Sequence, residues 1–256
     1  MRRAASILIP LLLACSCQGL LVPDLSRLGR DGVVIPDEYF RAYTLKHFDT
    51  DEDGILQQDE ADAVGQIDFV SDDAQSVEGI QHFPNLTSIL ISGKEAGEKT
   101  ANGKIKSIDL SCNPELGSLS LMRNQITSLD LSHNTALSYI DLYCNKLSRL
   151  DVSMLDNLEF LSIFGNQFTH FQLSDSHIKE LHVDSNMLED LVLDCPQLEY
   201  LNCSGNNLTF LDLTKCPRLE RADFTDNPGL KVIYLKSGQV IGEYHKDPDT
   251  VIEYIE

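Results

Sequence analysis

Residues 119–145 read LSLMRNQITSLDLSHNTALSYIDLYCN, and Asn124 and Asn145 each close a stretch in which apolar and polar residues alternate. The pattern continues along the chain, and six such asparagines occur at Asn124, Asn145, Asn166, Asn186, Asn206 and Asn227. The intervals between them are 21, 21, 20, 20 and 21 residues. A repeat of this length predicts a solenoid, in which each repeat forms one coil stacked on the next.

Each repeat contains two segments of the form L-x-x-L-x-L. One ends at the asparagine just described, and the other ends at Asn113, Asn134, Leu155, Asp175, Cys195 or Cys216. Alternating apolar residues predict an extended strand with one buried side. The inward pairs are Leu119/Leu121, Ile140/Leu142, Leu161/Ile163, Leu181/Val183 and Leu201/Cys203. One such strand per coil predicts an α/β repeat solenoid with a parallel sheet on its concave face.

Asparagine suits the end of each strand because its side-chain amide both donates and accepts hydrogen bonds. We expect each amide to satisfy backbone groups of the turn in its own coil and in the next coil. A single asparagine is an ordinary turn residue, whereas six in register indicate a ladder of amides.

The repeats resemble the leucine-rich repeats of bacterial surface proteins, similar in kind to the internalins and to lipoproteins of gut bacteria. Residues 129–137, LDLSHNTAL, carry the resemblance, which extends over residues 66–230. It implies adhesion or ligand capture as the function. Relatives of this type often repeat cysteine at the inward position that Cys203 occupies here, and the other repeats lack it, so a cysteine ladder is not expected.

The ends of a solenoid differ from its repeats because they must cover exposed apolar faces. We place the solenoid at residues 66–230, with a small helical cap at 36–65 and a C-terminal β cap at 231–256. Ile67 and Phe69 predict the first strand.

Shorter elements are expected within these regions. Residues 77–83 predict a helical turn, and residues 93–104, rich in glycine, lysine and glutamate, predict a surface loop. Residues 232–235 and 250–255 predict strands that close the last coil.

Residues 49–60 in the N-terminal cap read DTDEDGILQQDE, which fits every required position of an EF-hand-type calcium loop. Gly54 permits the sharp turn at the sixth position. A shell of about seven oxygens suits calcium better than magnesium, and we expect a structural ion that rigidifies the cap. The predicted ligands are Asp49, Asp51, Asp53, the carbonyl of Ile55, Gln57 through water, and Glu60 with two oxygens.

Apolar residues at helical spacing predict a helix over residues 37–48, before this loop, and a short helix over residues 59–64, after it. EF-hand loops generally pair through their apolar eighth residue, here Leu56, and the sequence contains no second loop. We therefore expect Leu56 to pack on the first coil. Two alternatives stay open: an acidic turn without an ion, and a dockerin-like module that joins a surface complex, although dockerins have duplicated loops.

The N-terminus has the residue order of a secretory signal, because Arg2 and Arg3 precede an apolar run over residues 7–13. The run ends in LLAC at residues 12–15, which resembles the lipobox of bacterial lipoproteins. The resemblance implies a signal peptide at residues 1–14, lipidation of Cys15 and a tether over residues 15–35. Alternatives are Cys17 as the lipidated residue, or an ordinary secretory signal.

By the same resemblance, serine instead of aspartate after Cys15 favours an exported lipoprotein of the outer membrane, and display at the cell surface stays open. The apolar run is too short to span a bilayer, and no other segment reaches the roughly 18 apolar residues that a spanning helix needs. We therefore expect membrane attachment through the lipid anchor alone.

The composition is acidic, with 20 Lys and Arg against 40 Asp and Glu and a formal charge of −20. Cleavage before Cys15 removes two arginines, which gives 18 − 40 = −22. This charge argues against nucleic acid and anionic lipid headgroups as partners. It favours solubility and a local demand for cations. We expect a monomer.

Cys195 and Cys216 each precede proline and lie 3 residues before the next repeat leucine. Adjacent coils would bring them close enough for a disulfide, but repeat families also accept free cysteine at this position, which we favour. We expect Cys203 to be a buried core thiol.

Solvent-facing positions of the ladder strands should line the concave face. Exposed aromatic residues on a rigid sheet favour a binding patch, and Tyr143 and Phe164 stack on neighbouring coils; the alternative is cross-strand packing that only stabilises the sheet. The solvent-facing positions are Ser120, Met122, Asp141, Tyr143, Ser162, Phe164, His182, Asp184, Asn202, Ser204, Asp223 and Thr225. Of these, the candidate ligand-binding residues are Met122, Asp141, Tyr143, Phe164, His182, Asp184 and Asp223.

The sequence contains no nucleophile elbow, paired metal histidines or glycine-rich phosphate loop. His182 beside Asp184 could form a catalytic cluster, as in a hydrolase, but solvated polar residues are expected on such a face. His177 and His182 lie on different segments, which argues against a shared zinc ion. We therefore predict a non-enzymatic recognition or adhesion protein that binds a protein or glycan ligand.

Overall fold

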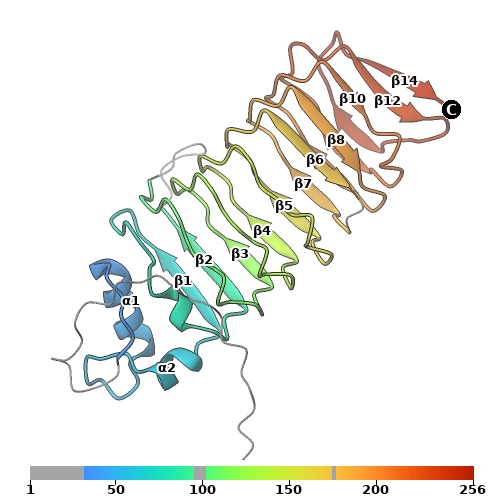
Figure 1. The fold of residues 1–256 in the computed structure, drawn as a ribbon. Helices are drawn as coiled ribbons and strands as arrows, with labels where there is room; N and C mark the ends of the chain where they lie inside the picture. Colours follow the sequence, from blue (N-terminus) through green and yellow to red (C-terminus); the bar gives the residue numbers. More distant parts are fainter. Residues whose placement is uncertain (1–31, 95–101, 175–176) are drawn as a thin grey trace, which may run out of the picture. The chain divides into compact units, whose positions relative to one another are not determined.

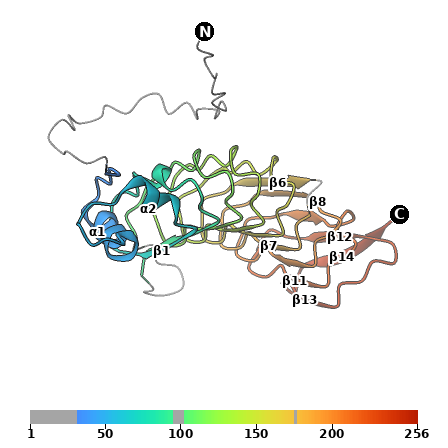
Figure 2. The same ribbon diagram turned by 90° about the horizontal axis from the view of Figure 1, so that it is seen from below.

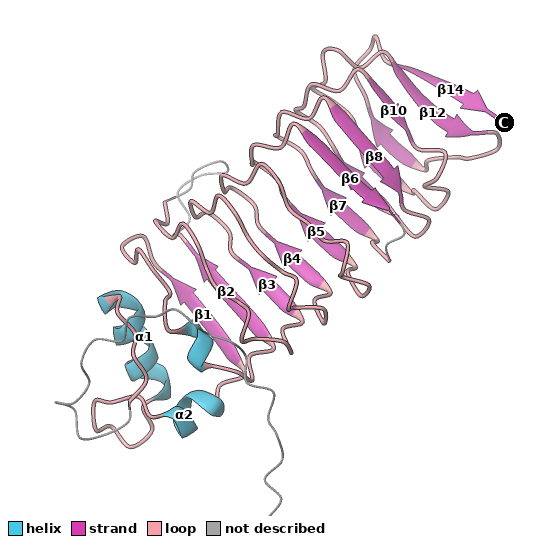
Figure 3. Ribbon diagram, viewed as in Figure 1, coloured by secondary structure: helices cyan, strands magenta, loops and turns pink. Residues whose placement is uncertain are grey.

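The computed structural model describes residues 32–94, 102–174 and 177–256. Residues from Gly32 to Glu256 form one compact unit. Two short helices lead into a series of coils whose strands lie side by side (Figures 1 and 3). The predicted signal peptide, Cys15, Cys17, Asp175 and the tether up to residue 31 lie outside the described residues.

A nine-stranded sheet runs through successive coils, and all of its strand pairs are parallel. Leu119, Ile140 and Leu161 are direct partners across neighbouring strands, so the coils stack in phase with the repeat. The predicted solenoid with a parallel sheet is therefore confirmed. In spatial order the strands are β1 (Gln66–Val70), β2 (Ser88–Ser92), β3 (Ser118–Ser120), β4 (Tyr139–Asp141), β5 (Phe160–Ser162), β7 (Glu180–His182), β9 (Tyr200–Asn202), β11 (Arg221–Asp223) and β13 (Glu243–His245).

The second segment of the repeat forms strands on the opposite side of the coils, where Figure 2 shows β6 and β8 across from β7 and β11. Here β6 (His170–Ser174) pairs with β8 (Asp190–Asp194), and a separate three-stranded sheet has the order β10–β12–β14. The latter strands are β10 (Phe210–Asp212), β12 (Val232–Lys236) and β14 (Val251–Ile255).

Pairing in this second segment is less regular than the sequence predicted. In the coils that carry Asp130 and Asp151, the aspartate accepts a hydrogen bond from the backbone N–H two residues later, and no strand forms there among the described residues. Gln172 and Val192 occupy the same position in β6 and β8, which are five-residue strands. Asp212 makes the same bond to Thr214 and yet lies in the paired strand β10, so this bond does not by itself prevent strand formation.

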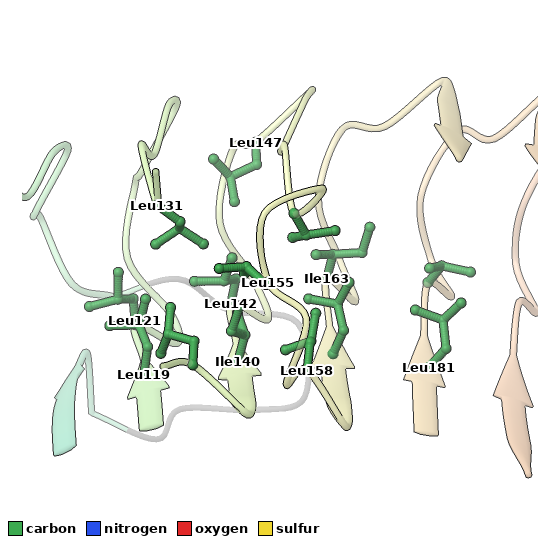
Figure 4. Close-up of a cluster of buried hydrophobic side chains, with 14 of the residues drawn as sticks. Leu119, Leu121, Leu131, Ile140, Leu142, Leu147, Leu155, Leu158, Ile163 and Leu181 are labelled. Atoms are coloured by element: carbon green, nitrogen blue, oxygen red, sulfur yellow. The ribbon is translucent and has the colours of Figure 1, made fainter. Parts of the chain in front are cut away.

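Leucine, isoleucine and valine side chains from both segments fill the space between the two sides of each coil (Figure 4). The inward pairs predicted from the sequence are all buried, and Leu119, Ile140 and Leu181 have no exposed surface. Burial of such a side chain stabilises a fold by about 1.5–3 kcal/mol, so each coil depends on its neighbours for most of its stability.

The asparagine ladder joins adjacent coils through a repeated set of hydrogen bonds. The amide nitrogen of Asn145 donates to the carbonyls of Leu142 and Tyr143 in its own coil and to that of Leu121 in the preceding coil. Its oxygen accepts from the N–H of Ile126, also in the preceding coil. The linked coil is therefore the one before, whereas the sequence analysis expected the one after. Asn166, Asn186, Asn206 and Asn227 repeat this pattern.

The residue before each ladder asparagine has left-handed backbone geometry, with φ between 52° and 65°. Gly165 and Gly205 adopt this conformation without strain. At the other four positions a residue with a side chain bears a cost of about 1 kcal/mol or more. The six positions are Arg123, Cys144, Gly165, Ser185, Gly205 and Asp226.

The N-terminal cap contains α1 (Glu38–Phe48) and α2 (Gln58–Asp62), and the short 3₁₀ helix η1 (Ile80–His82) follows between β1 and β2. These elements match the predicted helices, although the second is shorter than expected. Asp37 caps α1 with one carboxylate oxygen and accepts from the backbone N–H groups of Gln75 and Ser76 with the other. Phe40 packs on Phe69 of β1 with ring centroids 5.3 Å apart. No helix among the described residues is long and apolar enough to cross a membrane.

The C-terminal region contains both predicted strands, β12 and β14, and one that the sequence analysis missed. That strand, β13, pairs in register with β11 and extends the nine-stranded sheet. Asp247 accepts from the backbone N–H groups of Asp226 and Asn227. The predicted cap therefore continues the organisation of a repeat.

None of the described cysteines forms a disulfide, as favoured from the sequence for Cys195 and Cys216. The Cys195 thiol donates to the carbonyl of Leu173 at 3.5 Å. Burial raises the pKa of Cys216 to about 12 and also raises the pKa of Cys203 well above its ordinary value. These thiols are core residues that remain protonated at neutral pH.

We predict that replacing Asn166 with alanine lowers the free energy of unfolding by about 2–4 kcal/mol, because buried backbone groups then lose their partners. These groups are the carbonyls of Leu142 and Ile163 and the N–H of Leu147. Urea denaturation measures the change. Gln167→Ala, at the exposed neighbouring residue, is the control, and equal midpoints for the two variants would contradict the role of the ladder.

Candidate functional site

Side chains on the outer face of the nine-stranded sheet form three columns that cross successive coils. The sequence analysis identified the second and third columns but missed the first. The residues of the first column lie two positions before those of the second, so the same alternation places them on the same face. Ser120 and Ser162, expected to face solvent, are buried beneath their neighbours. The first column is Ser118, Tyr139, Phe160, Glu180, Tyr200 and Arg221; the second is Ser120, Asp141, Ser162, His182, Asn202 and Asp223; the third is Met122, Tyr143, Phe164, Asp184, Ser204 and Thr225.

A long aromatic row crosses the first and second columns. The rings of Tyr139 and Phe160 are stacked, with centroids 4.4 Å apart and planes inclined by 9°. The His182 ring lies between those of Phe160 and Tyr200, at 5.5 and 5.0 Å. The guanidinium of Arg221 lies 5.3 Å from the Tyr200 ring centre and ends the row. Such contacts stabilise neighbouring coils and fix the rings in place.

A short aromatic row lies in the third column. Tyr143 and Phe164 are stacked as predicted, with centroids 5.5 Å apart and planes inclined by 28°. The Arg123 guanidinium also lies over the Tyr143 ring, 5.0 Å from its centre. Arg123 was not predicted from the sequence, because its position in the left-handed turn lies outside the alternation of the strand.

An open depression of about 360 Å³ is lined by the three residues of the short row and, from the long row, by His182. Four predicted ligand residues line it, whereas Met122, Asp141 and Asp223 do not. The lining residues are Arg123, Tyr143, Ser162, Phe164, His182, Asp184 and Asn202.

Carboxylates of the second column are held by hydrogen bonds. Asp141 accepts from the backbone N–H of Tyr143 at 3.2 Å, and Asp223 accepts from the N–H and hydroxyl of Thr225. Burial raises the pKa of Asp141, an effect partly offset by the Tyr143 N–H, the Ser162 hydroxyl and nearby His182. Asp141 is therefore a carboxylate that is incompletely solvated before any partner binds.

The polar groups of the depression are not arranged as a catalytic pair. His182 Nε2 lies 2.8 Å from Glu180 Oε1, and the Ser162 hydroxyl bonds to Asp141, so serine and histidine have separate partners. A nucleophile and its base must share a hydrogen bond for acyl transfer. The face offers fixed rings, carboxylates and amides, which are groups suited to holding a ligand.

The loop predicted to hold calcium brings three carboxylates together. One oxygen from each of Asp49, Asp51 and Asp53 lies within 4.8 Å of the others. Asp49 Oδ2 accepts from the N–H of Gly54, whose φ is +83°, and Asp49 Oδ1 is buried with no hydrogen-bond partner among the described residues. An all-oxygen set with a buried oxygen lacking a partner fits a hard cation such as calcium.

Two of the remaining predicted ligands, Glu60 and Gln57, are engaged within the protein. Glu60 Oε1 accepts from the N–H and hydroxyl of Thr50, and Oε2 accepts from the N–H of Gln57 at 3.0 Å. The Gln57 amide nitrogen donates to Asp53 at 3.1 Å, while its oxygen is buried with no partner in the described part of the chain. Glu60 and Gln57 thus lie against the loop that they would help to close.

A strand-like contact that the sequence analysis missed lies beside this loop. Gly32 and Gln57 form an antiparallel bridge, and the Val33 N–H donates to the Leu56 carbonyl at 2.8 Å. A β-carbon on Gly32 would lie 2.5 Å from Ile55 Cγ2, so glycine permits the approach. Residues 32–33 therefore occupy the edge at which a second EF-hand loop would pair.

Comparison with known proteins supports the repeat assignment. A family model described as Leucine Rich Repeat matches residues 197–219. The fold is similar to that of the functional domain of InlJ from Listeria monocytogenes, with 21% identity over 87% of this chain and a TM-score of 0.51. This chain spans 62% of that structure. InlP from Listeria monocytogenes is similar at 16% identity over 86% of this chain and 69% of that one, with a TM-score of 0.53. No curated protein matches the sequence.

We predict that Asp141→Asn is more stable than the unmodified protein at pH 7 and that the difference disappears near pH 3. The folded-state pKa of Asp141 is raised, so its ionisation destabilises the fold once the pH exceeds the unfolded value of about 3.9. Thermal melting at both pH values measures the effect.

The matched control is Asp130→Asn. Hydrogen bonds from Ser132 lower the pKa of exposed Asp130, so its ionised form favours folding and this variant should lose stability at pH 7. Shifts of the same sign for both variants would contradict the assignment.

Proposed function

We propose that this chain is a non-enzymatic recognition protein that binds a protein or glycan ligand on the outer face of its nine-stranded sheet. The observation that carries the proposal is the stacked short aromatic row, which lines an open depression together with His182 of the long row. Aromatic residues held on a rigid scaffold lose little conformational entropy when a ligand binds, and they dominate many binding interfaces. Adhesion or ligand capture is the activity that such a face supports.

A hydrolase is the less favoured alternative. Catalysis of bond cleavage usually needs a site that excludes water, because electrostatic stabilisation is strong only in such a site. The depression is open, and its serine and histidine do not bond to each other. These features support binding without turnover.

We further propose that the loop over residues 49–60 holds a structural calcium ion. The clustered carboxylates and the buried Asp49 oxygen support this role, since an ion would neutralise their repulsion. A dockerin-like role in a surface complex is disfavoured, because residues 32–33 already occupy the pairing edge of the loop.

The location that we propose is the outer membrane or the cell surface, as an exported monomer attached through a lipid on Cys15. The support is the order of charged and apolar residues before Cys15 and the resemblance of LLAC to a lipobox. Intact mass spectrometry of the mature chain tests it, since a protein that begins at another residue or lacks acyl mass would refute the anchor.

We predict that millimolar calcium raises the melting temperature over that measured in chelator, because a ligand that binds the folded state alone stabilises it by about 2.7 kcal/mol at 100 times Kd. Glu60→Ala should abolish the calcium-dependent shift. Asp59→Asn, which removes a neighbouring exposed charge outside the predicted ligand set, should retain it. Equal shifts in both variants would refute the site.

We predict that the double variant Tyr143→Ser and Phe164→Ser loses ligand capture while its melting temperature changes little. Arrays of glycans and of proteins, probed with the full chain in calcium, supply the ligands for this measurement. The control replaces Met154 and Met187 with serine, since both are exposed and lie outside the three columns. Unaltered capture by the aromatic double variant would rule out the short row as a binding surface.

A further inference from the structure

We infer that the ligand of this face is a protein segment that presents arginine or lysine next to aromatic side chains, and not a glycan. The inference deepens the proposed function and rests on it. Two observations carry it: the way in which the rings of the two rows cover one another, and the charges that lie between the rows.

Each ring of the two stacked pairs has at least one face covered by a neighbour. Tyr139 and Phe160 are nearly parallel at 4.4 Å, so each covers a face of the other. Tyr143 has Phe164 on one side and the Arg123 guanidinium over the ring. Because the rings stack along the direction in which the coils repeat, their planes stand across the sheet.

Ring edges and ring faces attract different chemical groups. The face of an aromatic ring is negative and its edge is positive. Sugars bind aromatic side chains by laying C–H groups, which are weakly positive, flat against a ring face. Faces already covered by a neighbouring ring or guanidinium cannot be used in this way. Edges instead accept the faces of a partner's aromatic rings, in the edge-to-face geometry that aromatic pairs favour.

The charges on the same face favour a basic partner. Four carboxylates, those of Asp141, Glu180, Asp184 and Asp223, lie in or beside the rows, against two arginines. Both arginines lie over tyrosine rings, at 5.0 and 5.3 Å from the ring centres. A formal charge of −20 for the whole chain adds long-range attraction for a basic partner.

Arg123 and Arg221 already lie over the Tyr143 and Tyr200 rings, so a partner's cation would pair with the carboxylates of this face instead of with those ring faces. A planar guanidinium suits such a site because it can bond a carboxylate through two N–H groups at once. Asp141 is already partly desolvated, so pairing with a guanidinium costs less than it would at an exposed carboxylate.

The test uses the full chain in calcium, immobilised and probed with displayed random peptides and, separately, with a glycan array. We expect selected peptides to be enriched in arginine or lysine beside tyrosine, tryptophan or phenylalanine. Their affinity should fall as salt rises. The double variant Asp141→Asn and Asp184→Asn should bind these peptides with an affinity at least about tenfold lower than that of the unmodified chain. The matched control, Asp130→Asn and Asp151→Asn, removes the same charge from the opposite segment and should bind as the unmodified chain does.

Each outcome decides the matter. Retention of a glycan that is lost with Tyr143→Ser and Phe164→Ser would overturn the inference while upholding the face as the ligand site. Selection of acidic or uncharged peptides, or of none, would also overturn it. If basic peptides bind equally to the aspartate variants and to the aromatic double variant, both the inference and the proposed face fail. Melting curves confirm that each variant is folded.

Discussion

The asparagine at the end of each ladder strand is the interaction on which the structure depends. From Asn145 to Asn227 the buried amide joins three carbonyls and one N–H from two consecutive coils, whereas the Asn124 amide joins three carbonyls only. Once these bonds fix the turn, each strand lies in register with the strand before it. The leucine columns, and the columns of the outer face, follow from that register.

This register determines which side chains become neighbours on the surface. Residues about 20 positions apart become neighbours at strand spacing, so a tyrosine in one repeat and a phenylalanine in the next form a stacked pair. Neither ring would be held by its own coil alone. The long row arises in the same way, from the rings of four coils and Arg221 of a fifth, with His182 filling the position left where Glu180 interrupts the aromatic column.

Much of this architecture could be predicted because the same pattern, alternating apolar residues that end at an asparagine, occurs six times in the sequence. The period gave the parallel sheet, the buried pairs and the Tyr143–Phe164 stack. The missed features depend on local exceptions: the segments at Asp130 and Asp151 that form no strand, Arg123 in a turn outside the alternation, and the contact of residues 32–33 with the loop over residues 49–60. Tyr139 and Tyr200 follow the same alternation as the predicted residues, and they belong to the outer face because the outward-facing residues of each strand begin two positions earlier than predicted.

The left-handed turns that precede the ladder asparagines form an edge of the outer face, and the side chains at this edge can vary without a change in the buried framework. Arg123 reaches a neighbouring ring from such a turn, although glycine would fit the backbone there with less strain. The chain thus retains arginine at position 123, despite the backbone strain of a left-handed turn, where the arginine side chain lines the depression. A lineage could therefore alter selectivity by exchanging residues in these turns, coil by coil, while every leucine and asparagine beneath stays in place.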